Sequence, residues 1–142
     1  MLFVGIDTGH DTGFAIWESG CQAFDAVATL RIHEALDRVR KLHAAYGDDL
    51  VVVFEDARQR KWLPQERSNA QYRGRLQGAG SVKRDATIWE DFCQDLGIRY
   101  EAKAPQRGAT KWSAETFRNI TGWTGRTSNH ARDAALLVYG RK

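Results

Sequence analysis

The sequence predicts an α/β domain with one five-stranded mixed sheet flanked by helices, and the order of its apolar segments leads to that prediction. Residues 2–7, 12–17 and 22–29 read as three closely spaced strands, as in an antiparallel meander. Residues 31–46 then carry apolar side chains at helical spacing. The segment 50–55 is almost entirely β-branched or aromatic, which is typical of a strand buried on both faces. Because a helix separates it from the meander, we expect it to join the sheet in parallel.

The second half of the chain is expected to be mainly helical. The predicted elements are a basic, polar loop (57–66), a long helix (68–96), a short fifth strand (98–101) and helices at 112–120 and 130–139. Gly74, Gly78 and Gly80 fall inside the long helix, where each lowers helix propensity by about 1 kcal/mol relative to alanine. They indicate either close packing of another backbone or a break in the helix.

Length and composition indicate a single domain that spans residues 1–142. Hydrophobic residues make up 42% and charged residues 27%, as is usual for a globular protein. No apolar run approaches the ~20 residues of a transmembrane helix, and the chain begins with a strand instead of a signal sequence. Cys21 and Cys93 lack metal-ligand spacing and are expected to be free thiols. We therefore expect a cytoplasmic protein with no membrane partner.

Charge is unevenly distributed along the chain, although the net charge is only +3. Residues 1–56 hold four basic and ten acidic residues, whereas residues 57–84 hold eight basic and one acidic. Residues 85–98 are acidic again, and residues 99–126 have a net charge of +4. A solvated surface explains such runs equally well when they stand alone. Acidic strand ends beside basic segments are also what a metal-dependent nuclease needs, with carboxylates for the ion and cations for phosphates.

Four residues far apart in the chain form the candidate site. Asp7 and Glu55 each end an apolar strand, and His130 and Asp133 lie three apart on one face of the last helix. A carboxylate at the end of a buried strand is costly unless something neutralises it, and a divalent metal would do so. This arrangement predicts metal-assisted phosphodiester chemistry.

Each of these residues also has an ordinary structural explanation. Asp7 could be a turn-former before Thr8, and its motif also occurs in the phosphate loops of actin-like ATPases, which need two such domains. Glu55 could be a surface acid, and Asp56 competes with it because successive strand residues point to opposite faces. Asp133 could serve the dipole and capping of the last helix.

Several short segments match a known family in the order in which that family has them. They are GIDTG (5–9), TGFA (12–15), FE (54–55), RLQGAGSV (75–82) and HARDAA (130–135). With the order of the elements, they resemble RuvC-type Holliday junction resolvases of the ribonuclease H-like superfamily, including bacteriophage members. The resemblance covers the whole chain. It implies a ribonuclease H-like sheet.

The resemblance also implies an activity and a set of metal ligands. Asp7, Glu55, His130 and Asp133 would be catalytic and would hold two Mg²⁺ or Mn²⁺ ions. Paired symmetric nicks in four-way DNA junctions would leave 5′-phosphate and 3′-hydroxyl ends, and a homodimer would match the two-fold symmetry of the junction. The setting would be a bacterial or phage-infected cell. His130 replaces the carboxylate that other members have, so it could bind Mn²⁺ or act as a general base.

Six residues are candidates for contact with DNA. The loop after Glu55 alternates cations with a large aromatic side chain, which could stack on an unpaired base near the branch point or pack on its own helix. Two further cations follow the fifth strand, where the family binds phosphates. The six residues are Arg58, Arg60, Lys61, Trp62, Arg107 and Lys111.

Two other functions are compatible with the same residues. A ribonuclease H-like nuclease could act on other branched DNA or on structured RNA, and would differ mainly in its basic surfaces. A junction-binding protein without turnover would differ in having no need for four potential ligands. Preference for four-way over linear DNA would distinguish a junction resolvase from a nuclease with another substrate. Junction binding without cleavage would indicate the binding protein.

Overall fold

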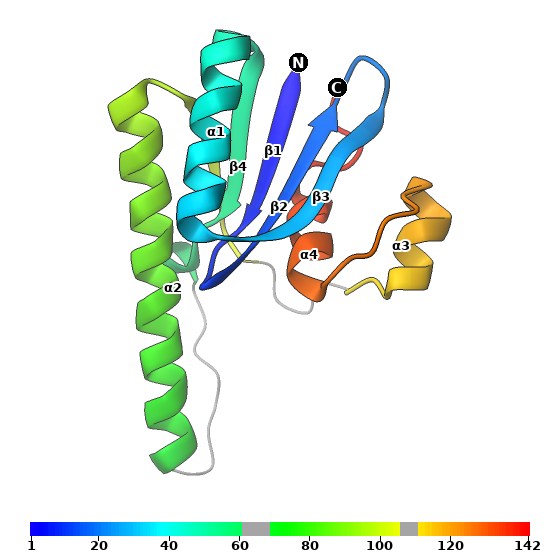
Figure 1. Ribbon diagram of the computed structural model, residues 1–142. Coiled ribbons are helices and arrows are strands. Elements are labelled where there is room, and N and C mark those ends of the chain that lie inside the picture. Colours follow the sequence, from blue (N-terminus) through cyan, green and yellow to red (C-terminus); the bar gives the residue numbers. More distant parts are fainter. Residues whose placement is uncertain (61–68, 106–110) are drawn as a thin grey trace.

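One mixed sheet of five strands forms the centre of the protein (Figure 1). The computed structural model describes residues 1–60, 69–105 and 111–142, without the side chains of residues 69–77 and 79. The strands are β1 (Leu2–Asp7), β2 (Asp11–Glu18), β3 (Ala23–Arg31), β4 (Leu50–Glu55) and β5 (Arg99–Lys103). Their order in the sheet is β3-β2-β1-β4-β5.

The pairing of the strands confirms the predicted mixed sheet. β2 pairs antiparallel with both β1 and β3, as expected for a meander. β4 runs parallel to β1, and β5 runs parallel to β4. Two parallel neighbours at the centre of the sheet bring the carboxyl ends of β1 and β4 to the same edge.

Helices cover both faces of the sheet (Figure 1). They are α1 (Ile32–Tyr46), α2 (Asn69–Leu96), α3 (Ala114–Thr121) and α4 (Asn129–Val138), with short 3₁₀ turns η1 (Gly47–Asp49) and η2 (Ala57–Gln59). α1 and α2 lie on one face, and α4 packs on the other, with α3 beside it. The amino-terminal part of α2 extends past the sheet.

Alternation of side chains along the strands divides the apolar core between the two faces. Ile6 and Phe54 belong to the core under α1 and α2, together with Trp89 of α2. Val53, the neighbour of Phe54, belongs to the core under α4, together with Ala134. Successive strand residues therefore serve opposite layers, as the pleat requires.

The long helix α2 is continuous through its glycines, so the predicted alternative of a break is wrong. A Cβ added at Gly78 or Gly80 would meet no described atom within 4 Å. Within the part of the chain that the structure describes, no other backbone packs closely on these two glycines, and close packing against the second copy of a homodimer stays a prediction.

Several boundaries differ from the predicted ones. The fifth strand runs to Lys103 because it continues the parallel ladder with β4. α3 begins at Ala114 instead of residue 112, since Ser113 caps it by accepting a hydrogen bond from the backbone N–H of Thr116. The expected loop contains the 3₁₀ turn η2, and position 68, where the long helix was predicted to begin, lies outside the described residues.

Both cysteines are free, as predicted: Cys21 is exposed, and burial raises the pKa of Cys93 to about 12. Among the described residues, no helix has the length and apolar character needed to cross a membrane.

Candidate active site

The two acidic strand ends lie side by side at one edge of the sheet. β1 and β4 are parallel neighbours in register up to Ile6 and Phe54, so Asp7 and Glu55 follow at the same level. Val53 faces the α4 side, and alternation places the Glu55 side chain on that side as well. Asp56 points to the other face, where it is buried against η2. The predicted choice of Glu55 over Asp56 therefore agrees with the pleat.

Helix α4 reaches this edge because two glycines leave room for its backbone. A Cβ on Gly5 of β1 would overlap the carbonyl oxygen of Ala134, and a Cβ on Gly13 of β2 would overlap that of His130. Backbone contact this close is possible only where the strand lacks side chains. The two glycines thus set the depth at which α4 packs on the sheet.

The helix brings both of its predicted site residues to the strand ends. Nδ1 of His130 lies 2.9 Å from Oδ2 of Asp7, although 123 positions separate them in the chain. Asp133 pairs with Lys111, whose Nζ lies 3.4 Å from Oδ2. The cap of α4 is Ser128, which accepts from the backbone N–H of Ala131, so capping by Asp133 is not observed.

Burial and neighbouring negative charge disfavour ionisation of Asp7 and Glu55. Burial is the main cause that raises the pKa of Asp7, and the charge of Asp133 raises it further, whereas the hydrogen bond from His130 lowers it. Burial also raises the pKa of Glu55, and the Asp7 charge adds to this effect. Among the described residues, the positive charges of Arg60 and then Lys111 lower the pKa of Glu55 and so oppose this shift. A bound cation would relieve this repulsion.

The donor set is suited to a hard divalent ion. Carboxylate oxygens suit Mg²⁺ and Mn²⁺, and the imidazole of His130 suits Mn²⁺ better than Mg²⁺. Among the residues that the structure describes, no three His, Cys, Asp or Glu side chains are grouped closely enough to hold an ion as they stand. Asp7 instead bonds to His130, and Asp133 to Lys111. Side-chain rotation would have to free these carboxylates for a metal.

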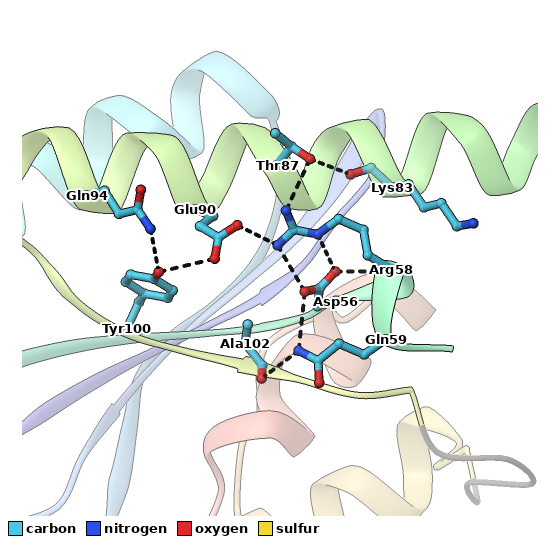
Figure 2. Close-up of polar contacts among 9 residues, drawn as sticks. All are labelled: Asp56, Arg58, Gln59, Lys83, Thr87, Glu90, Gln94, Tyr100 and Ala102. Carbon is cyan, nitrogen blue, oxygen red and sulfur yellow. Dashed lines mark hydrogen bonds and ion pairs between the residues drawn. The ribbon is translucent and has the colours of Figure 1, made fainter. Parts of the chain in front are cut away.

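The predicted DNA-binding residues have different surroundings. Lys111 lies at the site, with its side chain 74% exposed, and Arg60 acts electrostatically on Glu55. Arg58 lies on the opposite side of the sheet, where its guanidinium bonds to Asp56 and Glu90 (Figure 2). Contact of Arg58 with DNA stays a prediction, but the structure gives this side chain an internal partner that the sequence did not predict. The remaining candidates, Lys61, Trp62 and Arg107, lie outside the described residues.

Arg132 is a further residue of the site that the sequence did not predict. It is buried between the two site residues of α4, and three carbonyl or amide oxygens accept hydrogen bonds from its guanidinium. The acceptors belong to Trp112, Thr127 and Asn129, so Arg132 joins α4 to the segment that follows Lys111. An arginine in an otherwise apolar helical pattern was the only signal in the sequence.

No model of a known protein family matches this sequence, and no curated protein matches it.

Proposed function

We propose that this protein is a metal-dependent endonuclease of the RuvC type, which resolves four-way DNA junctions. The observation that carries the proposal is the convergence of Asp7, Glu55, His130 and Asp133, from three separate elements, at one edge of the sheet. A structural role alone would give no reason to gather three mutually repelling carboxylates at this edge.

The strand order supports a ribonuclease H-like fold. Three antiparallel strands, a helix, a parallel strand, a second helix and another parallel strand follow one another in the order expected for that superfamily. The site also falls where the central parallel strands β1 and β4 end, with the last helix alongside. The order of the elements along the chain already belonged to the resemblance, and the order of the strands in the sheet and the position of the site add its spatial arrangement.

The chain's own residues would perform distinct tasks in phosphodiester hydrolysis. Asp7, Glu55 and Asp133 would supply the carboxylates that hold two divalent ions, with His130 as a further donor. Such ions activate water and stabilise the leaving 3′-oxygen of an in-line displacement. In the metal-free protein, the hydrogen bond between His130 and Asp7 holds the two side chains together at the site. Once a metal has displaced that bond, His130 would either bind the ion or accept a proton from water.

The proposed substrate follows from charge and symmetry. Lys111 places an exposed cation beside the carboxylates, where it could contact the phosphate next to the scissile bond. A homodimer would present two such sites to the two opposed strands of a four-way junction. Mg²⁺ or Mn²⁺ would be the cofactor.

Incubation with a fixed synthetic four-way junction tests the proposal. The purified protein would receive Mg²⁺ or Mn²⁺, with linear duplex as the competing substrate and Asp7→Asn as the inactive control. Symmetric nicks in opposed strands, absent in the control, are the expected result. Equal cutting of linear duplex would point to a general nuclease, and junction binding without nicks in either metal would refute catalysis.

A further inference from the structure

An ionic network of partly exposed side chains surrounds the buried carboxylate of Asp56 (Figure 2). It lies on the α2 side of the sheet, opposite the side that Glu55 faces. Asp56 accepts hydrogen bonds from Nε and Nη2 of Arg58 at 2.8 and 3.0 Å. The same guanidinium reaches α2, where Nη2 lies 2.7 Å from Oε2 of Glu90 and Nη1 donates to Thr87 at 3.4 Å. One arginine therefore connects the residue after Glu55 to the middle of α2.

The network continues onto β5, the neighbour of β4. The hydroxyl of Tyr100 donates to Oε1 of Glu90 at 3.2 Å and accepts from Gln94 at 2.9 Å. The ring of Tyr100 stacks on Phe54, with centroids 5.9 Å apart. Gln59 of η2 adds another link by donating to the carbonyl oxygen of Ala102.

Both sequence neighbours of Glu55 are thus held on the face that α2 covers. Phe54 is fully buried in that core, and Asp56 is 3% exposed and held by Arg58. The backbone N–H of Asp56 also donates to the carbonyl oxygen of Lys103 at 2.7 Å. Because side chains alternate along a strand, holding residues 54 and 56 on one face directs residue 55 to the other. That is the face on which Asp7 and α4 lie.

The ion pairs of Arg58 with Asp56 and Glu90 are suited to fixing the end of β4 against α2. The Asp56 side chain is 5% exposed, and those of Arg58 and Glu90 are 32% and 28% exposed. Charge-assisted bonds of a planar guanidinium to two carboxylates fix geometry as well as distance. Truncating Arg58 would leave the buried carboxylate of Asp56 without its cationic partner.

We propose that Arg58 is a positioning residue, which holds the end of β4 against α2 so that Glu55 is directed toward Asp7. Its effect on turnover rests on the proposed nuclease function, whereas its hold on the strand end does not. This role differs from direct contact with DNA, because the guanidinium would act through Asp56 and Glu90 and not through phosphate. The two roles predict opposite results for affinity and rate.

The test compares Arg58→Met, Arg58→Lys and Glu90→Gln with the wild type. Glu90→Gln retains the arginine and removes the negative charge of its carboxylate partner on α2, so it tests the hold even if Arg58→Met fails to fold. Arg99→Met is the matched control, since Arg99 lies at the other end of β5 and its side chain donates to the carbonyl oxygen of Asp48, away from Asp56 and Glu90. Three quantities are measured: amide hydrogen exchange, junction affinity in Ca²⁺ and single-turnover cleavage in Mn²⁺.

If Arg58 positions Glu55, exchange at the Asp56 amide accelerates in Arg58→Met and Glu90→Gln, while exchange at Val52 in mid-strand stays slow. Cleavage falls by roughly tenfold to a hundredfold, as small misplacements of reacting groups can cause, with junction affinity unchanged. Arg58→Lys retains the charge without the planar fork and recovers only part of the rate. The control matches the wild type in all three quantities.

Unchanged exchange at Asp56 in both variants would overturn the proposal, whatever happens to cleavage. A loss of junction affinity and a flatter salt dependence, with the saturating rate intact, would overturn it in favour of contact with phosphate. If the wild type cuts no junction, the proposed function fails, and the exchange comparison still decides whether Arg58 holds the end of β4.

Discussion

Gly13 of β2 packs directly on the backbone of His130, with no space between them for a side chain. A Cβ at Gly13 would overlap the carbonyl oxygen of His130 and would lie 2.9 Å from Cβ of Asp7. The same contact leaves Nδ1 of His130 2.9 Å from the Asp7 carboxylate. The missing side chain of Gly13 therefore determines how close the helix and strand parts of the site can come.

Gly13→Ala should push α4 away from the sheet. We expect the free energy of unfolding to fall by about 1–3 kcal/mol, the usual cost of overpacking, because the atoms in the way belong to the backbone. Cleavage should fall with it. Chemical denaturation measures the stability change. Gly78→Ala is the control: no described atom lies near its Cβ, and alanine should stabilise α2 by about 0.5–1 kcal/mol. If Gly13→Ala leaves the free energy of unfolding unchanged, α4 does not pack as tightly on β2 as the structure indicates.

Mn²⁺ should stabilise the folded protein through the cluster of carboxylates. At a free concentration 100 times the Kd, the gain is about 2.7 kcal/mol, visible as a higher Tm in thermal melts. Asp7→Asn and Asp133→Asn should remove most of this gain because each deletes one of the proposed donors. Asp25→Asn, which changes an exposed carboxylate on β3, should retain it. Equal stabilisation of all three variants would place the ion elsewhere.

Without metal, the protein should be less stable at neutral pH than at acidic pH, because Asp7 and Glu55 are then ionised in a partly buried site. Burial raises the pKa of Asp7 and Glu55 above their ordinary values of 3.8 and 4.5. Their protonated forms therefore favour folding, and that contribution is complete below the ordinary values and is lost as pH rises through the raised ones. In EDTA at pH 7, Asp7→Asn should be more stable than the wild type, because burial penalises the carboxylate charge and not the neutral amide. Denaturation between pH 4 and 8 should show this difference shrink with acid, and a constant difference would refute the cause.

Lys111→Met should weaken DNA binding without unfolding the protein. The side chain is 74% exposed, so its pair with Asp133 is worth less than about 0.5 kcal/mol of stability. If it contacts phosphate, affinity for all junction sequences falls, and the slope of log K against log salt flattens by about one unit. Lys41→Met on α1 is the control, with a side chain 77% exposed. An unchanged slope in Lys111→Met would argue against direct contact.

Arg132→Met should destabilise the protein, although the methionine could occupy much of the same apolar space. The change leaves the carbonyl oxygens of Trp112 and Thr127 without their donor, which costs about 2–3 kcal/mol for bonds from a charged group. Urea denaturation measures the loss. The exposed Arg118 of α3 supplies the control, and its change to methionine should stay within about 0.5 kcal/mol. Equal effects of the two substitutions would show that the buried hydrogen bonds contribute little.

Local sequence patterns predicted most of the elements because strand alternation and helical spacing are properties of neighbouring residues. The strand 50–55 and the helix 31–46 were predicted to within about one residue of β4 and α1. The boundaries that moved depend on distant partners. β5 extends to Lys103 only because Glu55 lies opposite it in the ladder, and no pattern within residues 98–103 encodes that register.

The sequence by itself determined which chemical groups the candidate site offers, since Asp7 and Glu55 end apolar strands and His130 and Asp133 share one face of a helix. Tertiary structure alone decided how they pair: His130 with Asp7, and Asp133 with Lys111. The tertiary structure also pairs Arg58 with Asp56 and Glu90. The physical reason is that ion pairs and hydrogen bonds form between whichever groups the packed layers bring within about 3 Å. That proximity depends on the depth of α4 and α2 on the sheet, which no local pattern records.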